Sequence, residues 1–286
     1  MSLRRVDTGP ELVEVESVAS DWSESPHQPA LSEETRLHLR SGHGTVFVSD
    51  SPRGIASITT TKRAAIGMVE VAVPGDVSAS DFWDRAEPDV KSEAVRKGYR
   101  ALELLTWDAE LRGEMEDRGW MRVRAVNRGK RTSSPIPPQG AGGLVHVFQG
   151  ELDIDGLLEV NNLAFEGHPQ AGNWDHPGLE ALFEEPWFDP AGLFVTRDDL
   201  MVTGFCWTKV YPDRIGEIYL LAVRPGHAGK GLGRALVITG IEYLTTGRGC
   251  EESVVYWDPS NAAAANLYQS IGFGVDRVGE VFRHRM

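Results

Sequence analysis

Two pairs of similar stretches occur in the same order in the two halves of the chain. The segment AIGMVEVAVPG at 65–75 matches RIGEIYLLAVRPG at 214–226, and LLTWD at 104–108 matches VVYWD at 254–258. Each stretch contains an apolar run typical of a buried strand. Because the matches keep their order and have similar spacing, the sequence predicts a tandem duplication of one α/β domain. The alternative is chance similarity between two α/β domains.

Residues 132–143, TSSPIPPQGAGG, separate the two halves. They are rich in proline and glycine and lack hydrophobic periodicity, which is typical of a linker. A chain of 286 residues is also long enough for two domains. We therefore expect an N-terminal domain at 1–131 and a C-terminal domain at 144–286.

The second half alternates between strand-like and helical patterns. Four apolar or alternating runs precede a glycine-rich stretch, and helical spacing follows it. One more strand, a helix and a last strand complete the pattern. The expected strands are 144–148, 193–196, 200–210, 215–223, 253–257 and 273–282, and the expected helices begin at 232 and at 261.

The glycine-rich stretch RPGHAGKGLGR at 224–234 has Gly229, Gly231 and Gly233 at alternate positions. Such a turn between a strand and a helix presents backbone N–H groups and the positive end of the helix dipole to an anion. A tight turn that binds nothing would use the same residues. Lys230 is followed by glycine and not by Ser or Thr, which argues against a nucleoside triphosphate site. The stretch follows the fourth strand-like run of its half, whereas a dinucleotide fingerprint follows the first strand.

The motifs resemble those of one known family. The pattern V-x-P-x-H-x-G-x-G-x-G at 223–233, followed by N-x-x-A-x-x-L-Y-x-x-x-G-F at 261–273, is similar to the GNAT family of acetyl-CoA-dependent N-acetyltransferases. The resemblance implies an α/β (α+β) fold of two tandem GNAT-like domains, each a mixed, mostly antiparallel sheet flanked by helices. It also implies acetyl-CoA as co-substrate, with its pyrophosphate on the loop amides and its pantetheine arm on the preceding strand.

The coenzyme-binding residues that this resemblance implies lie in the strand, in the loop and in the last helix. Position 228, which is Arg or Gln in most members, is alanine in this chain, and we expect weaker coenzyme binding as a result. The implied residues are Leu221, Ala222, Val223, Ala228, Gly229, Lys230, Gly231, Leu232, Gly233, Arg234, Asn261, Ala264 and Asn266.

A narrower resemblance covers most of residues 144–286. The stretches VNNLAFEGHPQAGNW at 160–174, EPWFDPAGLF at 185–194 and GFCWTKV at 204–210 look like the mycothiol synthases, a tandem-domain branch of the GNAT family in actinobacteria. The resemblance implies that the C-terminal domain acetylates the cysteinyl amine of Cys-GlcN-inositol (desacetylmycothiol) to give mycothiol. Only the C-terminal domain of that branch is catalytically competent.

Acetyl transfer to an amine requires a proton acceptor, a donor to the developing oxyanion and a proton for the departing thiolate. Glu217 opens an otherwise apolar strand, which suits it to accept a proton, although a solvated edge-strand carboxylate is the alternative. By resemblance, Tyr268 protonates the thiolate; otherwise it is a core tyrosine. The backbone N–H of Leu221 is the expected oxyanion donor.

By resemblance, Lys209 and Tyr256 join Glu217 in binding the acceptor. On the residues alone, Lys209 could equally be a solvated strand-end lysine and Tyr256 a core aromatic. Gln170 replaces a carboxylate that touches the acceptor in the family, and this leaves the identity of the acceptor amine open. Of the two candidates Glu33 and Glu34 in the first domain, Glu34 is the expected contact with the acceptor.

The first half lacks several of these polar groups. No glycine loop follows Pro74-Gly75, and Met68 stands where the second half has Glu217, although a two-residue shift in the alignment would bring Glu70 close to that position. The residues Val71, Ala72 and Val73 match the pantetheine-binding strand as a vestige. We expect a degenerate, non-catalytic N-terminal domain that supports the acceptor site.

The composition limits the kinds of binding partner and the cellular compartment that we expect. A formal charge of −13 argues against a nucleic-acid or anionic-membrane surface. The beginning of the sequence does not read as a signal peptide, and no apolar run approaches the ~18 residues of a membrane span. Cys206 and Cys250 lie in apolar contexts and are expected to be buried free thiols. We expect a cytoplasmic monomer without a metal.

Two other functions fit parts of the pattern. An N-acetyltransferase for a different small amine or for a protein N-terminus would keep the same coenzyme site, and Gln170 leaves room for it. A non-catalytic acyl-CoA-binding module would keep the loop but needs neither Glu217 nor Tyr268.

Overall fold

The computed structural model of the chain describes residues 3–7, 10–22, 31–60, 65–132, 135–138, 144–166 and 174–286. The chain forms two compact units. Unit 1 comprises residues 1–126 and 278–286, and unit 2 comprises residues 127–277. The chain passes from unit 1 to unit 2 within one long strand, at residues 121–132, and returns to unit 1 within another, at residues 274–285. The units therefore do not coincide with the two halves of the sequence.

Unit 1 is built on a sheet with the strand order β1-β2-β3-β4-β5-β12. The pair β4–β5 is parallel, and the other pairs described here are antiparallel. The elements are β1 (Arg4–Val6), α1 (Pro10–Asp21), α2 (Glu33–Arg40), β2 (Gly44–Asp50), β3 (Arg53–Thr60), β4 (Ile66–Ala72), α3 (Ala79–Lys97), β5 (Ala101–Thr106), α4 (Ala109–Glu114) and β12 (Gly274–Arg285).

Unit 2 repeats this arrangement with the order β6-β11-β10-β9-β8-β7. The pair β10–β11 is parallel, and its other pairs are antiparallel. The elements are β6 (Met121–Thr132), β7 (Val145–Val147), η1 (Gly150–Leu152), α5 (Ile154–Ala164), α6 (His176–Phe183), η2 (Pro190–Gly192), β8 (Leu193–Asp198), β9 (Met201–Val210), β10 (Ile215–Val223), α7 (Leu232–Glu242), η3 (Tyr243–Gly247), β11 (Glu252–Trp257) and α8 (Ala262–Ile271). The mixed, mostly antiparallel sheets with flanking helices confirm the expected fold class.

The last strand of each sheet comes from the other half of the sequence. In unit 1, β12 pairs with β5, where Phe282 lies opposite Leu104. In unit 2, β6 pairs with β11, where Arg128 lies opposite Tyr256. The two halves of the sequence therefore exchange their final strands.

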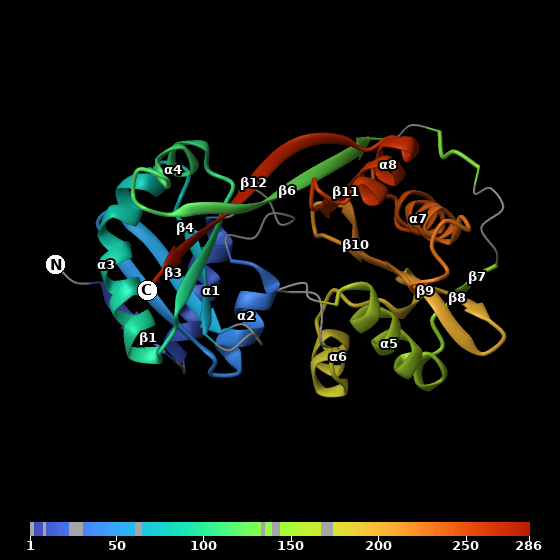
Figure 1. Cartoon of the computed structure of the whole chain (residues 1–286), viewed down its shortest axis with the longest axis horizontal. Helices are drawn as coiled ribbons and strands as arrows, with labels where there is room; N and C mark the ends of the chain where they lie inside the picture. Colours follow the sequence, from blue (N-terminus) through green and yellow to red (C-terminus); the bar gives the residue numbers. More distant parts are fainter. Residues whose placement is uncertain are drawn as a thin grey trace. The chain divides into compact units, whose positions relative to one another are not determined.

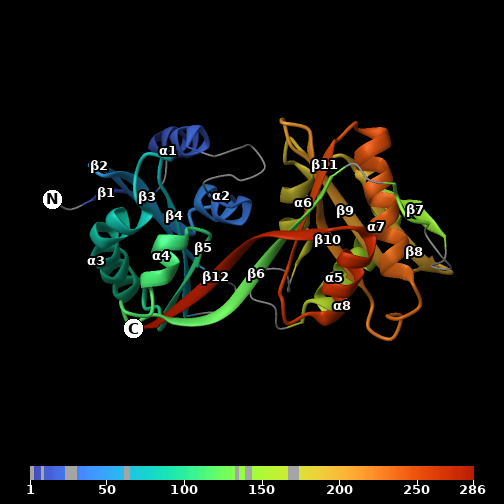
Figure 2. The same ribbon diagram turned by 90° about the horizontal axis from the view of Figure 1, so that it is seen from above.

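Helices cover both faces of each sheet, as Figures 1 and 2 show. In unit 2, α7 and α8 lie on one side of β9 and β10, and α5 and α6 lie on the other. The α7 side contains an apolar core in which Leu236, Ile241 and Trp257 are buried. Cys206 and Cys250 are buried free thiols. The periodicity of the sequence did not single out α5 and α6.

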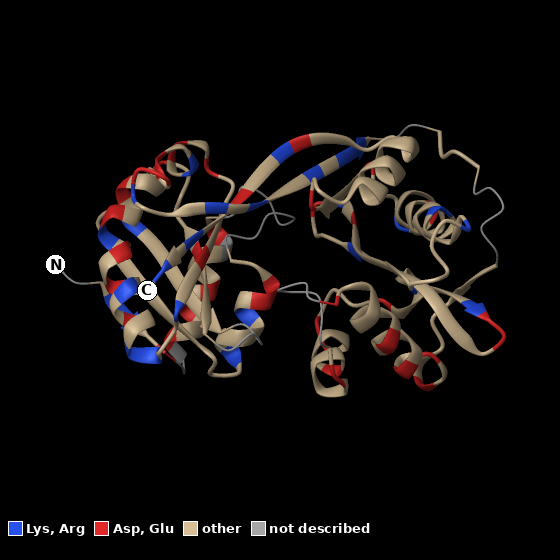
Figure 3. Ribbon diagram, viewed as in Figure 1, with Lys and Arg blue, Asp and Glu red and all other residues tan. Residues whose placement is uncertain are grey.

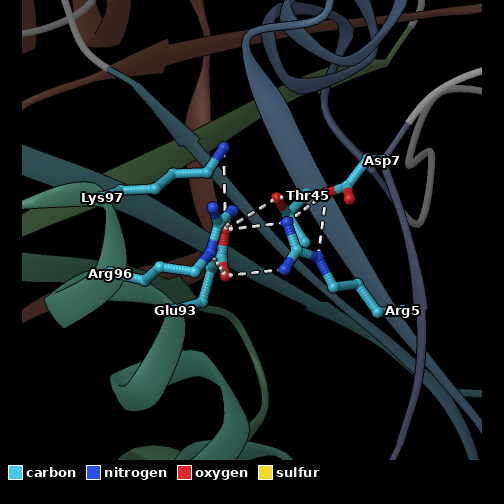
Figure 4. Close-up of polar contacts among 6 residues, drawn as sticks. All are labelled: Arg5, Asp7, Thr45, Glu93, Arg96 and Lys97. Carbon is cyan, nitrogen blue, oxygen red and sulfur yellow. Dashed lines mark hydrogen bonds and ion pairs between the residues drawn. The ribbon is translucent and has the colours of Figure 1, made fainter.

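A charged cluster around the buried Glu93 joins β1, β2 and α3 in unit 1 (Figure 4). Glu93 is 4% exposed and accepts hydrogen bonds from Arg96 and from the Thr45 hydroxyl, the latter at 3.1 Å. Arg5 lies 3.3 Å from Glu93 and also donates to Asp7. Burial by itself would raise the pKa of Glu93, but the hydrogen bonds from Arg96 and Thr45 and the charges of Arg5 and Arg96 outweigh it and hold that pKa below its usual range.

Charged side chains of both signs are spread over the two units (Figure 3). The charged residues of β6 are all Lys or Arg, β12 carries both acidic and basic residues, and α5 and α6 carry acidic positions. Among the described residues, no helix is long and apolar enough to cross a membrane.

Candidate active site

In unit 2, the pairing of β10 with β9 changes register within β10. Glu217 lies opposite Lys209 of β9, but one residue is inserted at Tyr219, so that Leu221 lies opposite Cys206. A bulge of this kind bends a strand and locally disrupts its pairing. The parallel pairing of β10 with β11 runs from Ile215 to Ile218 only. Beyond Ile218 the two strands therefore diverge, and the part of β10 that contains Leu221 can pair with an extended ligand.

The divergent end of β10 leads directly into the glycine-rich loop. Gly229 and Gly231 have φ of 79° and 84°, a left-handed conformation that residues with a Cβ rarely adopt. Gly231 is the N-cap of α7 and has no side chain with which to cap it. The first helical hydrogen bond runs from the N–H of Ala235 to the carbonyl of Gly231, at 3.1 Å, so the amides before it have no acceptor inside the helix.

This end of α7 fits the pyrophosphate of coenzyme A. An ideal Cβ on Gly229 would meet no atom within 4 Å, so the loop is open on that side. Ala228 and Lys230 are exposed, and Gly233 lies in the first turn of α7, which begins at Leu232. Free amides, an uncapped helix N-terminus and an open side together form a cradle for an anion. The divergent strand and the loop are consecutive along the chain and offer places for an extended segment and for an anionic group of one ligand.

Of the other predicted coenzyme residues, Asn261 and Asn266 lie on or beside α8, and Arg234 lies on α7. Asn261 is the N-cap of α8, and its Oδ1 accepts a hydrogen bond from the N–H of Ala264 at 3.0 Å. Asn266 is an exposed residue of α8. Arg234 donates a hydrogen bond from Nη1 to the hydroxyl of Ser270 at 2.9 Å. Asn261 therefore has a structural role as a helix cap, and Arg234 links α7 to α8.

Three of the predicted acceptor residues lie on one face of the sheet. Lys209 of β9 is directly opposite Glu217 of β10. On the other side of β10, Glu217 pairs with Val254 of β11, and Tyr256 is two residues further along β11. Side chains at these positions point to the same side of the sheet. Lys209 and Glu217 are each 6% exposed, so neither is a solvated strand-end residue. Burial raises the pKa of Tyr256, and the neighbouring charge of Glu217 raises it further.

Aromatic side chains surround the Lys209 ammonium, and the sequence analysis did not assign them to the site. Its Nζ lies 4.2 Å from the ring centre of Trp187, 5.0 Å from that of Tyr211 and 5.5 Å from that of Tyr219. Cation–π attraction of this kind is strongest when the cation is removed from water. Trp187 comes from the EPWF stretch, and Tyr219 is the inserted residue of the bulge, so neither position has a periodicity that would reveal it.

Tyr268 lies on α8 and is 5% exposed. Its ring is 5.4 Å from that of Trp257 and 5.9 Å from that of Phe273. The tyrosine thus belongs to the apolar core, yet it keeps an ionisable hydroxyl. Burial raises the pKa of Tyr268, so the phenol is protonated at neutral pH and can act as a proton donor.

Several predicted residues lie elsewhere. Gln170 lies outside the described residues. Glu34 is in the first turn of α2 in unit 1, where its carbonyl accepts a hydrogen bond from the His38 ring at 2.8 Å. Val71 and Ala72 are in β4, and Val73 follows that strand.

In unit 1, the strand that corresponds to β10 is β4, and its geometry is different. Its pairing with β3 keeps one register from Ala72 to Gly67, without a bulge, and Met68 lies opposite Thr59. The following helix α3 is capped by the Ser78 hydroxyl, which accepts a hydrogen bond from the N–H of Asp81 at 3.1 Å. A filled cap and an acidic first turn oppose an anion at this helix. Within the described residues, no group of acidic, His or Cys side chains is placed to hold a metal ion.

Comparisons of the sequence with known proteins identify the family of the chain. The sequence profile of the Acetyltransferase (GNAT) family matches residues 156–273. A mycothiol acetyltransferase of Salinispora arenicola is 32% identical over 289 residues, which cover 92% of the chain and 90% of that protein. A mycothiol acetyltransferase of Thermomonospora curvata is 42% identical over 161 residues, which cover 54% of the chain and 53% of that protein.

Solved structures share the fold of the whole chain. A GCN5-related N-acetyltransferase from Sphaerobacter thermophilus superimposes with a TM-score of 0.69 at 17% identity, covering 98% of the chain and 95% of that structure. A tandem GNAT protein from the clavulanic acid biosynthesis pathway gives a TM-score of 0.71 at 12% identity, with 99% and 98% covered. At these identities the similarity supports the fold alone.

Proposed function

The chain belongs to the mycothiol acetyltransferase family, and from this membership we propose that it acetylates the cysteinyl amine of Cys-GlcN-inositol to give mycothiol. The observation that carries the proposal is the arrangement within unit 2. A buried glutamate and a buried lysine lie opposite each other just before a bulged, divergent strand, and an uncapped glycine loop follows that strand. Under this proposal, Glu217 would be the base, the divergent half of β10 would bind the extended arm of the coenzyme, and the loop would be its anion cradle.

The coenzyme would lie along the divergent half of β10 and across the N-terminus of α7. Leu221, Ala222 and Val223 would hold the pantetheine arm. Residues 228–234 would hold the pyrophosphate with their backbone amides, and the exposed Asn266 of α8 would be a further contact of the coenzyme. When bound, acetyl-CoA supplies the acetyl group as a thioester.

Three groups of the chain would carry the chemistry. Glu217 would accept the proton of the acceptor amine, because only the neutral amine is a nucleophile. The backbone N–H of Leu221 would stabilise negative charge on the carbonyl oxygen under attack. Tyr268, whose pKa is raised by burial, would donate its proton to the thiolate as it departs.

The acceptor would occupy the face of the sheet opposite α7. Lys209 and Tyr256 share that face with Glu217 and offer one cationic and one phenolic donor to a polar sugar. The rings of Trp187 and Tyr219 are half-buried beside them and provide an apolar wall. Gln170 would complete the proposed acceptor set, and the role of Glu34 in binding the acceptor stays a prediction.

Unit 1 would be a scaffold without its own coenzyme, given its regular β4 and its capped α3. We further propose that the protein acts in the cytoplasm as a monomer. Its two cysteines are buried free thiols, which suits a reducing compartment.

A direct assay of acetyl transfer tests the proposed function. Purified protein would be given acetyl-CoA and Cys-GlcN-inositol, and release of coenzyme A would be compared with that for polyamines, aminoglycosides and peptide N-termini. We expect the highest kcat/KM with Cys-GlcN-inositol. Turnover of another amine without turnover of this thiol-bearing amine would refute the proposed substrate but keep the acetyltransferase.

A further inference from the structure

Tyr211 lies at the junction of β9 and β10, next to Lys209 and Glu217. Its backbone is held at two points, because its N–H donates to the carbonyl of Ile215 and its carbonyl accepts from the N–H of Arg214, each at 2.9 Å. The four-residue loop from Tyr211 to Arg214 is therefore a closed turn that holds the backbone of Tyr211 in place.

The side chain of Tyr211 reaches back over the two strands that it connects. Its hydroxyl donates a hydrogen bond to Oε2 of Glu217 at 2.5 Å. Its ring centre lies 5.0 Å from the Nζ of Lys209. One side chain thus contacts both members of the buried pair, and the hydrogen bond fixes how the Glu217 carboxylate is rotated.

We propose that Tyr211 is a positioning residue of the reaction, which holds the Glu217 carboxylate in the orientation from which it accepts the proton of the acceptor amine. The inference rests on the proposed function, in which Glu217 is the base. A general base must lie within hydrogen-bond reach of the proton that it removes, and a carboxylate free to rotate would spend less time in that geometry.

The hydrogen bond also affects the charge of the base. A hydroxyl that donates to a carboxylate stabilises its ionised form, so that loss of the hydroxyl makes ionisation of Glu217 less favourable. The acidic limb of the pH profile of kcat/KM should then move to higher pH. Within the part of the chain that the structure describes, the charged and titratable groups facing Glu217 include Lys209 on β9, Tyr211 in the turn and Tyr256 on β11, with the Arg128–Asp276 pair beyond Tyr256.

The test is a comparison of Tyr211→Phe with the wild-type protein. We expect kcat to fall by about 10- to 100-fold, the equivalent of one hydrogen bond to a charged group, and the acidic limb of kcat/KM to move to higher pH. The acetyl-CoA dissociation constant, measured by calorimetry, should stay at the wild-type value and shows that the variant is folded. An unchanged pH profile would overturn the proposal, because a merely structural tyrosine would not move it.

A double-mutant cycle separates a role through Glu217 from a direct one. In the Glu217→Gln background, Tyr211→Phe should lower kcat by much less than in the wild-type background. An equal loss in both backgrounds would show that Tyr211 does not act through Glu217.

The matched control is Tyr243→Phe. Tyr243 is also in unit 2 and donates from its hydroxyl to a carboxylate, Oδ2 of Asp189, at 2.5 Å. This variant loses the same kind of hydrogen bond and should keep the wild-type pH profile. If the wild-type protein acetylates another amine, the same variants are compared on that amine, so the proposed acceptor and the role of Tyr211 can fail independently.

Discussion

Lys209 and Glu217 stand directly opposite each other on β9 and β10, and each side chain is 6% exposed. A charge buried to this extent is costly unless other groups compensate it. The aromatic rings around Lys209 and the Tyr211 hydroxyl on Glu217 supply such compensation. Two opposite charges are thereby kept where the acceptor amine is proposed to bind.

Replacement of Glu217 by glutamine should remove the base with little change in shape. We expect kcat to fall by about 10²-fold or more, the usual contribution of general-base catalysis. Glu252→Gln is the control, because Glu252 lies on the neighbouring strand β11 and pairs with Lys130. The measurement is the steady-state rate of acetylation by both variants, and the control should keep the wild-type rate. A wild-type rate for Glu217→Gln would remove this residue from the mechanism.

Replacement of Gly229 by alanine should weaken coenzyme binding. An L-residue at a φ of 79° costs about 1–2 kcal/mol, so the loop would tend to leave the geometry that presents its amides. We expect the dissociation constant for acetyl-CoA to rise about tenfold. Gly98→Ala introduces the same strain at a φ of 75° at the end of α3; it should reduce thermal stability and leave coenzyme affinity unchanged. Equal affinities of the two variants would contradict the role of the loop.

The chain should bind one coenzyme. The N-terminus of α7 is uncapped, whereas that of α3 is capped by Ser78 and carries Asp81 in its first turn. Isothermal titration with acetyl-CoA should give a stoichiometry close to one per chain. Two sites of comparable affinity would show that unit 1 has kept a functional coenzyme site.

Phe282 should be essential to unit 1 although it lies near the end of the sequence. It is 1% exposed and packs into the core of unit 1 from β12. We expect Phe282→Ala to reduce the free energy of unfolding by about 3–5 kcal/mol, the usual loss for a buried phenylalanine. Val278→Ala on the same strand removes an exposed side chain and should change it little. Chemical denaturation of both variants gives the comparison, and equal midpoints would contradict the packing of β12.

The Glu93 cluster should make unit 1 sensitive to acid. The pKa of Glu93 is held below the ordinary value of 4.5 in the folded state, so its contribution to stability is complete above that pH and is lost as the pH falls through the folded-state pKa. Glu93→Gln should therefore lower the unfolding midpoint at pH 7 and differ less from the wild type at strongly acid pH. Glu11→Gln, which removes an exposed partner of Arg4, is the control. A difference that does not change with pH would refute the ionic role of Glu93.

The sequence alone was sufficient for the elements of unit 2 that have a strong local pattern. The expected strands at 193–196, 200–210, 215–223 and 253–257 correspond to β8, β9, β10 and β11, and the helices expected from 232 and 261 correspond to α7 and α8. Apolar periodicity and the glycine loop are properties of neighbouring residues, so they can be read without the fold.

The candidate site was predicted less completely. Glu217, Lys209 and Tyr256 are close in space as expected, but Tyr211, Trp187 and Tyr219 were not foreseen. Tyr211 lies in a turn and Trp187 in a segment without periodicity. Their contacts with Lys209 arise from the packing of separate elements, which no local pattern records.

The sequence by itself determined that this is a tandem acetyltransferase fold with one intact glycine loop, because a strand, a glycine turn and a helix are encoded by adjacent residues. Only the tertiary structure decided that β6 and β12 complete the sheets of the opposite halves and that a bulge at Tyr219 separates β10 from β11. Strand partners and register depend on which edges meet in the folded chain. That choice is made by long-range packing and not by any short stretch of residues.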